Sequence, residues 1–284
     1  MSRVRKLAIR DIEMEIEEAG EGARAFVLVH GFTGSRDDFR EQMAPLGALG
    51  RTIAVDQRGH GGTTNSGKAE LYAVANLVED LCAAFEALGL ERADLLGHSL
   101  GGVVALHFTL AHPERVASLV LMDTSPRPIR GRSSETARAA IAAFAREHGM
   151  AALAQRMRQM AAANPAVAPA AKRAEERMGS DAFWERIQRK HEAMDPVAWD
   201  ALSAQLGQLA AVVDRLGEID CPTTIVVGAE DTPFLEPSDE MERRVRGARR
   251  VTIPDAAHSP QLENPAAWLE AIRGHLTWAR ADRR

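Results

Sequence analysis

The sequence predicts an α/β fold with a doubly wound, mostly parallel eight-stranded sheet and a helical cap inserted after the sixth strand. First, short apolar runs alternate with segments of helical length through most of the chain. Second, several of these runs are apolar at every position, which is typical of strands buried on both faces. Third, the alternation stops over residues 126–215, where only helical patterns occur.

The chain begins with the pattern of a β-hairpin, and expected strands then alternate with expected helices. Leu7–Arg10 and Ile12–Ile16 alternate apolar and polar residues, as strands of a half-buried antiparallel hairpin do. The later strands are expected at Ala25–Val29, Thr52–Val55, Ala93–Leu96, Ser118–Met122, Thr223–Val227 and, from a weaker pattern, Arg249–Ile253. The helices between and after them are expected at Arg36–Leu46, Leu71–Leu88, Leu100–Ala111 and Ala266–Ala279.

Prolines at 126 and 128 end the sixth strand and open the helical insertion. Its helices are expected at Ser134–His148, Met150–Ala163, Ala170–Lys190 and Pro196–Arg215. The strand pattern resumes after Ile219–Pro222. The sequence therefore divides into a core of residues 1–125 and 216–284 and a helical cap of residues 126–215.

Composition limits the classes of function. The 284 residues carry a formal net charge of −5, which argues against nucleic acid as the main partner. No apolar run is long enough to span a bilayer, and no apolar signal-peptide segment follows the basic N-terminus. Two cysteines make no disulfide framework, so a cytoplasmic protein is expected. The oligomeric state cannot be inferred from these patterns.

Gly97-His98-Ser99-Leu100-Gly101 lies between an apolar strand pattern and an apolar helix pattern. In this setting a Gly-x-Ser-x-Gly run indicates a nucleophile elbow, a tight turn that holds a serine in a strained backbone conformation. Glycines are needed two residues before and after the serine because side chains there would clash. Ser99 is therefore the expected nucleophile.

A serine nucleophile needs a base, and the base needs an acid that orients it. His258 follows the last expected strand, where a loop can place its imidazole over the elbow. Asp231 follows the Thr223–Val227 strand and lies between Ser99 and His258 in sequence, so it can come from a strand end of its own. Asp123, at the end of the preceding strand, is the alternative acid, whereas Asp255 is too close to His258 in sequence to come from another strand end.

The transition state of acyl transfer also needs two N–H donors for its oxyanion. One is expected from Leu100, the residue after the nucleophile. The other is expected from Phe32, in the glycine-rich turn His30–Ser35 after the third strand. No plausible cluster of His, Cys and carboxylate ligands appears, so no metal and no organic cofactor is expected.

Taken together, these motifs resemble those of the α/β-hydrolase superfamily, in its serine-nucleophile, cap-containing branch. The matching pieces are His30–Gly34, Asp56–Gly61, the elbow, Gly228 with Asp231, and His258 followed by Glu263-Asn264-Pro265. Serine at position 99 excludes the haloalkane dehalogenases and epoxide hydrolases of this fold, which use aspartate. The resemblance leaves carboxylesterases, lactonases and carbon–carbon bond hydrolases. The motif His-Gly-Phe-Thr-Gly-Ser is also similar to that of the menaquinone-pathway synthase, an enzyme that eliminates pyruvate.

The expected function is a serine hydrolase that cleaves a small carboxylic ester or lactone through an acyl-enzyme. The cap should close an apolar pocket, with Phe32, Met157 and Trp184 among its substrate-binding residues, so the substrate should have an apolar acyl part. The alternative is a carbon–carbon bond hydrolase or a pyruvate-eliminating lyase of the synthase type. Arginines at the start of the cap could then clamp a substrate with several carboxylates: Arg127, Arg130, Arg132 and Arg138.

Overall fold

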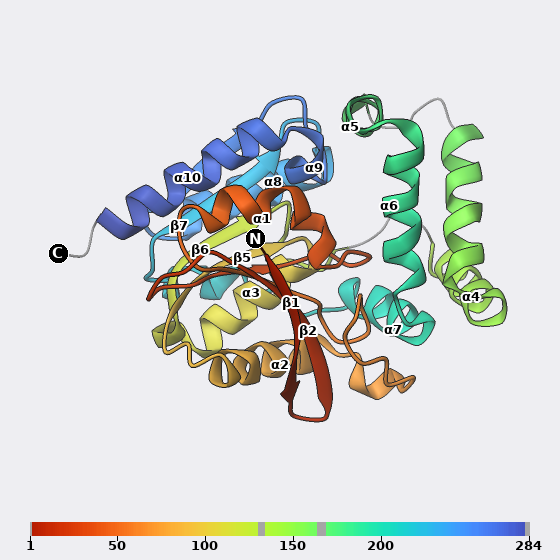
Figure 1. Ribbon diagram of the computed structural model, residues 1–284, viewed down its shortest axis with the longest axis horizontal. Coiled ribbons are helices and arrows are strands. Elements are labelled where there is room, and N and C mark those ends of the chain that lie inside the picture. Colours follow the sequence, from red (N-terminus) through yellow and green to blue (C-terminus); the bar gives the residue numbers. More distant parts are fainter. Residues whose placement is uncertain (1, 130–133, 164–168, 282–284) are drawn as a thin grey trace.

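The computed structural model describes residues 2–129, 134–163 and 169–281 (Figure 1). Its sheet has eight strands in the order β1-β2-β4-β3-β5-β6-β7-β8. The strands are β1 (Arg3–Ile9), β2 (Ile12–Ala19), β3 (Phe26–Val29), β4 (Thr52–Val55), β5 (Ala93–His98), β6 (Val116–Met122), β7 (Thr223–Gly228) and β8 (Arg249–Ile253). All eight expected strands are present, and the hairpin strands are longer than their sequence pattern predicts.

The sheet is antiparallel at one edge and parallel over the rest. β1 pairs with β2 through the turn between Ile9 and Ile12, and β2 pairs antiparallel with β4. From β4 through β8 every pairing is parallel. Parallel neighbours bring their carboxyl ends to one edge, so the loops after β3, β5, β6, β7 and β8 meet there.

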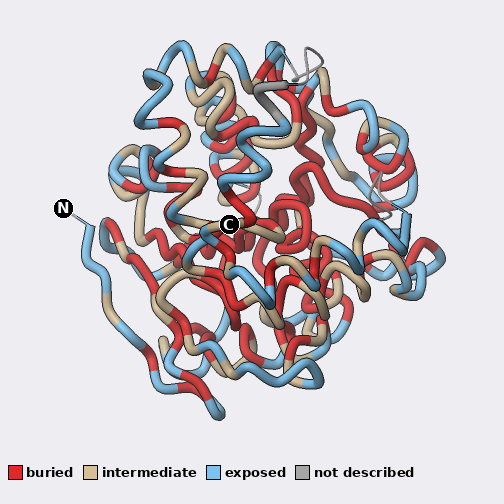
Figure 2. Tube along the Cα trace, turned by 90° about the vertical axis from the view of Figure 1, so that its right-hand side faces the viewer, coloured by how far each residue is buried: buried red, intermediate tan, exposed pale blue. Residues whose placement is uncertain are grey.

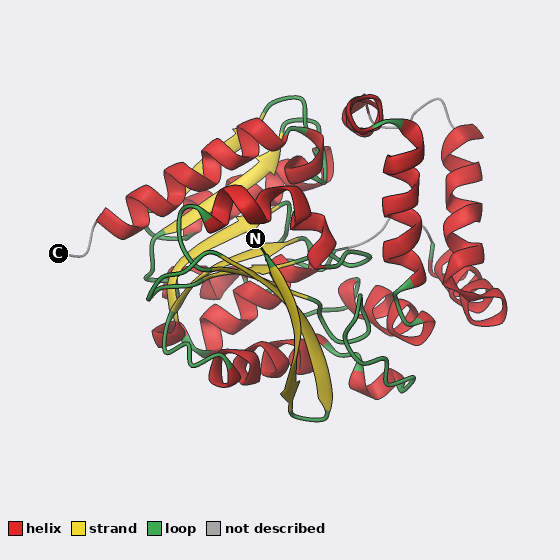
Figure 3. Cartoon of the chain, viewed as in Figure 1, coloured by secondary structure: helices red, strands yellow, loops and turns green. Residues whose placement is uncertain are grey.

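Helices cover both faces of the sheet (Figure 3). Alternate side chains of each buried strand point to opposite faces, so Val27 and Val29 join one apolar cluster while Phe26 and Leu28 join the other. Helices α2 (Val74–Ala87), α3 (Leu100–Ala111) and α8 (Thr232–Arg244) contribute to the first cluster, and α1 (Arg40–Gly47) and α10 (Pro265–Ala281) to the second. Figure 2 shows the buried segments gathered at the centre of the molecule. No described helix combines the length and apolarity needed to cross a membrane.

Short helical turns complete the core. The expected helix at Arg36–Leu46 is a 3₁₀ turn, η1 (Arg36–Phe39), followed by α1. Ser35 caps the turn by accepting the Asp37 N–H at 3.2 Å. The other turns are η2 (Ala69–Leu71), η3 (Pro113–Arg115), η4 (Val213–Glu218) and the short helix α9 (Pro260–Glu263). Helix α8 was not expected from the sequence, because prolines at 233 and 237 interrupt its pattern.

The insertion after β6 is entirely helical in its described residues and packs at one end of the core (Figure 1). Its helices are α4 (Glu135–Ala163), α5 (Pro169–Met178), α6 (Ser180–Glu192) and α7 (Pro196–Leu206). Gly149 breaks α4 with φ of 84°, which agrees with the two helices expected on either side of it. Two expectations were wrong. Gly179, with φ of 83°, divides the expected Ala170–Lys190 helix, and the last helix ends at Leu206 rather than Arg215.

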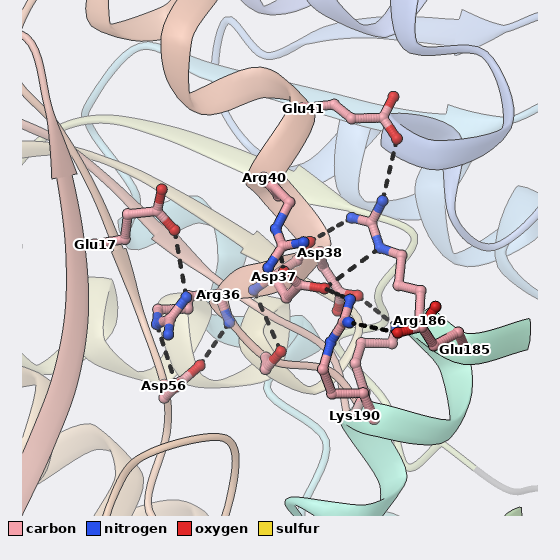
Figure 4. A network of polar contacts seen from close by, with 12 residues as sticks. Glu17, Arg36, Asp37, Asp38, Arg40, Glu41, Asp56, Glu185, Arg186 and Lys190 are labelled. Atoms are coloured by element: carbon pink, nitrogen blue, oxygen red, sulfur yellow. Dashed lines mark hydrogen bonds and ion pairs between the residues drawn. The ribbon is translucent and has the colours of Figure 1, made fainter. Parts of the chain in front are cut away.

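A charged seam joins α6 to the core, and Figure 4 shows most of its members. The seam consists of Arg186, Arg189 and Lys190 of α6 and Asp37, Asp38 and Glu41 of η1 and α1. Arg186 is nearly inaccessible to solvent; it donates to the Asp37 carbonyl and to Glu41 Oε1, the latter at 3.2 Å. Lys190 contacts Asp38. Several of these charges are buried, and their contacts link helix α6 of the insertion to the segment that follows the turn after β3.

Candidate active site

Ser99 stands on a strained turn between β5 and α3. Its φ is 51° and its ψ is −113°, a conformation that costs free energy in any residue with a Cβ. Added Cβ atoms at the flanking glycines would collide with backbone: at Gly97 2.2 Å from the Gly101 carbonyl oxygen, and at Gly101 2.3 Å from that of Val29. The elbow therefore requires glycine at both positions.

A chain of hydrogen bonds connects Ser99 with two side chains from distant loops. His258 Nε2 lies 3.1 Å from Ser99 Oγ, and His258 Nδ1 lies 2.8 Å from Asp231 Oδ2. Asp231 follows β7 and is buried, whereas the His258 side chain, after β8, is 43% exposed. The structure thus brings together the three residues that the sequence singled out, with the imidazole between hydroxyl and carboxylate.

The loop that carries His258 is fixed on three sides. His98 Nε2 donates to the His258 carbonyl oxygen at 2.6 Å. Glu263 Oε2 accepts the N–H groups of Ala257 at 2.7 Å and Ser259 at 3.1 Å, which flank the histidine. The Phe234 ring stacks on the imidazole with centroids 4.8 Å apart. No sequence signal indicated Phe234, because its helix was not expected.

The turn after β3 lies directly against the elbow. A Cβ on Gly31 would be 3.3 Å from Ser99 Cβ, so the next peptide, that of Phe32, is beside the nucleophile. Leu100 opens α3, where the first N–H groups of a helix have no partner within it. His60 Nε2 donates to the Phe32 carbonyl oxygen and thereby anchors the peptide that follows Phe32. The two expected oxyanion donors therefore belong to segments on either side of Ser99.

Three buried histidines around this turn stay neutral because burial disfavours their charged forms. Burial lowers the pKa of His30 to about 3 and that of His98 to about 4, and it also lowers the pKa of His60. Nearby histidines depress the first two further. His30 Nε2 accepts the Gln57 N–H at 3.0 Å. These rings fix loops by hydrogen bonding.

The alternative acid, Asp123, also lies at this edge. It is fully buried at the end of β6 and accepts the Gly228 N–H at 2.9 Å, whereas Asp255 is exposed. Asp231, not Asp123, makes the hydrogen bond to His258. Asp123, Asp231 and His258 form one group whose polar atoms lie within 4.8 Å of one another, close enough in principle to hold a cation. Within it, His258 Nδ1 is already bound to Asp231.

A cavity of about 670 Å³ opens over Ser99 between the core and the insertion. This size suits a small organic molecule. Its apolar wall comes from both parts of the chain: Phe32, Pro128, Ile129, Leu206, Pro233, Phe234 and Pro237. Polar side chains, among them Asp38, Lys190 and Arg127, line the rest. The cavity is therefore less uniformly apolar than the sequence predicts.

Of the three expected substrate-binding residues, the structure brings only Phe32 to this cavity. Met157 is 44% exposed, and Trp184 instead donates its indole N–H to Glu175 at 3.0 Å beneath the Arg158 guanidinium. Neither is among the residues that line the cavity. Their helices present these side chains elsewhere, and helical rotation cannot be read from composition.

The expected arginine clamp is not assembled in the described residues. Arg127 reaches the cavity but is bound through two nitrogens to Glu240, each at 2.7 Å. Arg138 pairs with Glu135 and Asp200 and does not line the cavity. Arg130 and Arg132 lie outside the described residues.

Comparison with known proteins agrees with this architecture. The family model described as "alpha/beta hydrolase fold" matches residues 24–265. A Bacillus subtilis protein assigned as a 2-succinyl-6-hydroxy-2,4-cyclohexadiene-1-carboxylate synthase is 27% identical over 92% of this chain and 93% of its own. A pimeloyl-[acyl-carrier protein] methyl ester esterase of Chromobacterium violaceum is 29% identical over 92% of this chain and 97% of its own.

A solved structure is similar over nearly the whole length. The thermophilic esterase of Thermogutta terrifontis is 27% identical, with a TM-score of 0.81 over 98% of this chain and 99% of that one. The eight-stranded sheet, the helical insertion after β6 and the match over residues 24–265 lead to one conclusion. This chain belongs to the alpha/beta hydrolase fold family.

Proposed function

We propose that this protein is a serine hydrolase that cleaves a small carboxylic ester or lactone through an acyl-enzyme. The observation that carries the proposal is the hydrogen-bonded chain Ser99–His258–Asp231 at the floor of a cavity closed by the cap. The esterase relatives from Chromobacterium violaceum and Thermogutta terrifontis support the same reaction class. We assign the cap to residues 126–215. Cys82 and Cys221 are not joined in a disulfide, which suits a reducing cytoplasm.

The reaction follows from the positions of the atoms. Ser99 Oγ attacks the carbonyl carbon while His258 Nε2 accepts its proton, and Asp231 stabilises the resulting imidazolium. The N–H groups of Phe32 and Leu100 stabilise the tetrahedral oxyanion. His258 then protonates the leaving alkoxide. In the second half, water attacks the acyl-enzyme, His258 takes its proton, and Ser99 leaves as the hydroxyl.

The cavity wall favours an apolar acyl group next to the reacting carbonyl. Phe32, Ile129, Leu206 and Phe234 offer apolar surface near Ser99. Burial of each additional methylene contributes about 0.8 kcal/mol until the available space is filled. We therefore expect kcat/KM on nitrophenyl esters to rise with acyl length and then to fall.

The direct test replaces the nucleophile and the base. Ser99→Ala and His258→Gln should each lower ester turnover about 10⁴-fold to 10⁶-fold, by analogy with other triads. A fluorophosphonate should label wild type on Ser99 but leave Ser99→Ala unlabelled. Circular dichroism checks that each variant is folded. Ester turnover that persists unchanged in Ser99→Ala would refute the proposal.

A second candidate is a pyruvate-eliminating lyase, or a carbon–carbon bond hydrolase, that uses the same residues. The Bacillus subtilis relative favours it, since it matches over almost its entire length. The cations at the cavity count against it, because Arg127 pairs with Glu240 and Lys190 with Asp38. An assay for pyruvate release from the substrate of that synthase tests the lyase. Release at a rate above that on every ester tested would favour the lyase.

A further inference from the structure

Asp123 has a buried carboxyl oxygen that takes no part in the proposed hydrolase reaction. The residue directly follows β6 and has φ of 45°, a left-handed conformation that is costly outside glycine. Its side chain is fully buried, and Oδ1 accepts the Gly228 N–H at 2.9 Å. Oδ2 is also buried and has no hydrogen-bond partner among the described residues. A buried carboxylate oxygen without a donor is strongly unfavourable, so the protonation state of Asp123 needs an explanation.

Two further carboxyl groups and one imidazole lie near Asp123. Asp231, from the turn before α8, and His258, from the loop after β8, each place a polar atom within 4.8 Å of one on Asp123. Glu263 of α9 also faces this group. Burial raises the pKa of Asp123 well above its ordinary value, and the Asp231 carboxylate raises it further. Ionising two adjacent buried carboxyl groups at once costs much free energy, because the two negative charges repel each other. One of the two groups therefore holds a proton.

The hydrogen bonds identify which carboxyl is ionised. Asp231 Oδ2 lies 2.8 Å from His258 Nδ1, and a carboxylate there is the natural acceptor of that N–H. Asp123 has no cation or imidazole as a hydrogen-bond partner among the described residues. The proton therefore belongs on Asp123, where it turns the unpartnered Oδ2 into a hydrogen-bond donor.

We propose that Asp123 is a neutral carboxylic acid whose Oδ2–H donates a hydrogen bond to Asp231 and so positions the carboxylate that holds His258. The inference rests on the proposed function only for the role of His258 as base. Asp123 is a positioning residue, because it acts through Asp231. The proton keeps a single negative charge next to His258, while both carboxyl groups remain anchored to their own strand ends.

Asp123→Asn is the sharpest variant because an amide mimics the neutral acid. Its oxygen can accept the Gly228 N–H, and its NH₂ can donate to Asp231. The primary measurement is an NMR titration of the His258 ring in free enzyme, with His258→Gln used to assign the signal. If Asp123 is neutral, the titration midpoint of His258 should stay within about 0.3 pH units, because no charge has been removed. A fall of about one unit or more would show that a negative charge was lost, and would overturn the proposal.

Activity provides the second measurement. With a nitrophenyl ester, Asp123→Asn should keep kcat within about threefold of wild type, whereas Asp123→Ala should lose about tenfold to hundredfold, the effect of removing one hydrogen bond to a charged group. Thermal melting checks folding, and Asp123→Ser replaces the alanine variant if that variant does not fold. An asparagine variant that is unfolded or as impaired as alanine overturns the proposal, as does an alanine or serine variant with unchanged kcat.

The two proposals fail in different ways. If no ester is hydrolysed in a Ser99-dependent manner, the proposed function fails, while the NMR titration still reports the charge on Asp123. If ester hydrolysis depends on Ser99 but the His258 midpoint falls in Asp123→Asn, the function stands and the neutral Asp123 is wrong.

Discussion

Acid should destabilise this protein through buried histidines, and His275 allows the effect to be calculated. His275 lies on α10, far from Ser99, and its ring nitrogens lie 2.8 Å from Thr224 Oγ1 and 3.0 Å from Ser118 Oγ. Burial lowers its pKa from 6.5 to about 4. Because the folded value is the lower one, the unfolded chain binds more protons below pH 6.5. Stability is therefore complete above that pH and is lost as the pH falls toward 4.

The magnitude follows from the two pKa values of His275. At pH 5 the unfolded histidine is almost fully protonated and the folded one is neutral, which removes about 2 kcal/mol from the free energy of unfolding. Urea unfolding, followed by tryptophan fluorescence at pH 7.5 and pH 5, measures the loss in wild type and in His275→Gln. Other buried histidines contribute equally to both proteins, so the variant should lose about 2 kcal/mol less than wild type. Equal losses in the two proteins would refute the reasoning.

Three further outcomes are expected. His98→Leu removes the donor to the His258 carbonyl and should lower kcat/KM on a nitrophenyl ester about tenfold, with partial recovery in His98→Gln. An unchanged kcat/KM would show that the loop bearing His258 is held without this hydrogen bond. Leu206→Ala enlarges the cavity and should shift the preferred acyl length toward longer esters. Trp184→Ala, outside the cavity lining, is the matched control and should leave the preferred length unchanged. Equal acyl-length profiles for the two variants would contradict the assigned lining. Arg186→Met should lower the free energy of unfolding by about 1–3 kcal/mol in urea titrations, since Asp37 and Glu41 keep other cationic partners; a neutral result would show that this contact does not hold the cap.

The core could be predicted from sequence because its signals are local. Apolar runs located all eight strands, and the glycines around Ser99 have steric reasons that involve only adjacent backbone. Asp231 and His258 could be located because they follow strands whose carboxyl ends meet at one edge. Each of these inferences needs the order of the elements but not the rotation of any helix.

The cap and the cavity lining could not be predicted in the same way. Whether Trp184 or Lys190 faces the core depends on the rotation of α6, which begins at a break that Gly179 imposes. Phe234 stacks on the His258 imidazole from α8, whose prolines at 233 and 237 interrupt the helical pattern of its sequence. The environment of Asp123 Oδ2 depends on which residues from other loops lie beside it in the fold, and no periodic pattern in the sequence indicates this.

The charged seam has a consequence for engineering substrate range by exchanging caps between relatives. Its anionic half, Asp37, Asp38 and Glu41, belongs to the segment that directly continues the turn bearing Phe32. A transplanted cap without matching cations would leave Asp38 and Glu41 without their partners Lys190, Arg177 and Arg186, while Asp37 would keep Arg40. The unpaired carboxylates would then lie in the segment that continues the turn bearing Phe32. Chimeras should therefore be designed with the segment from residue 31 to residue 41 and helix α6 taken from the same parent.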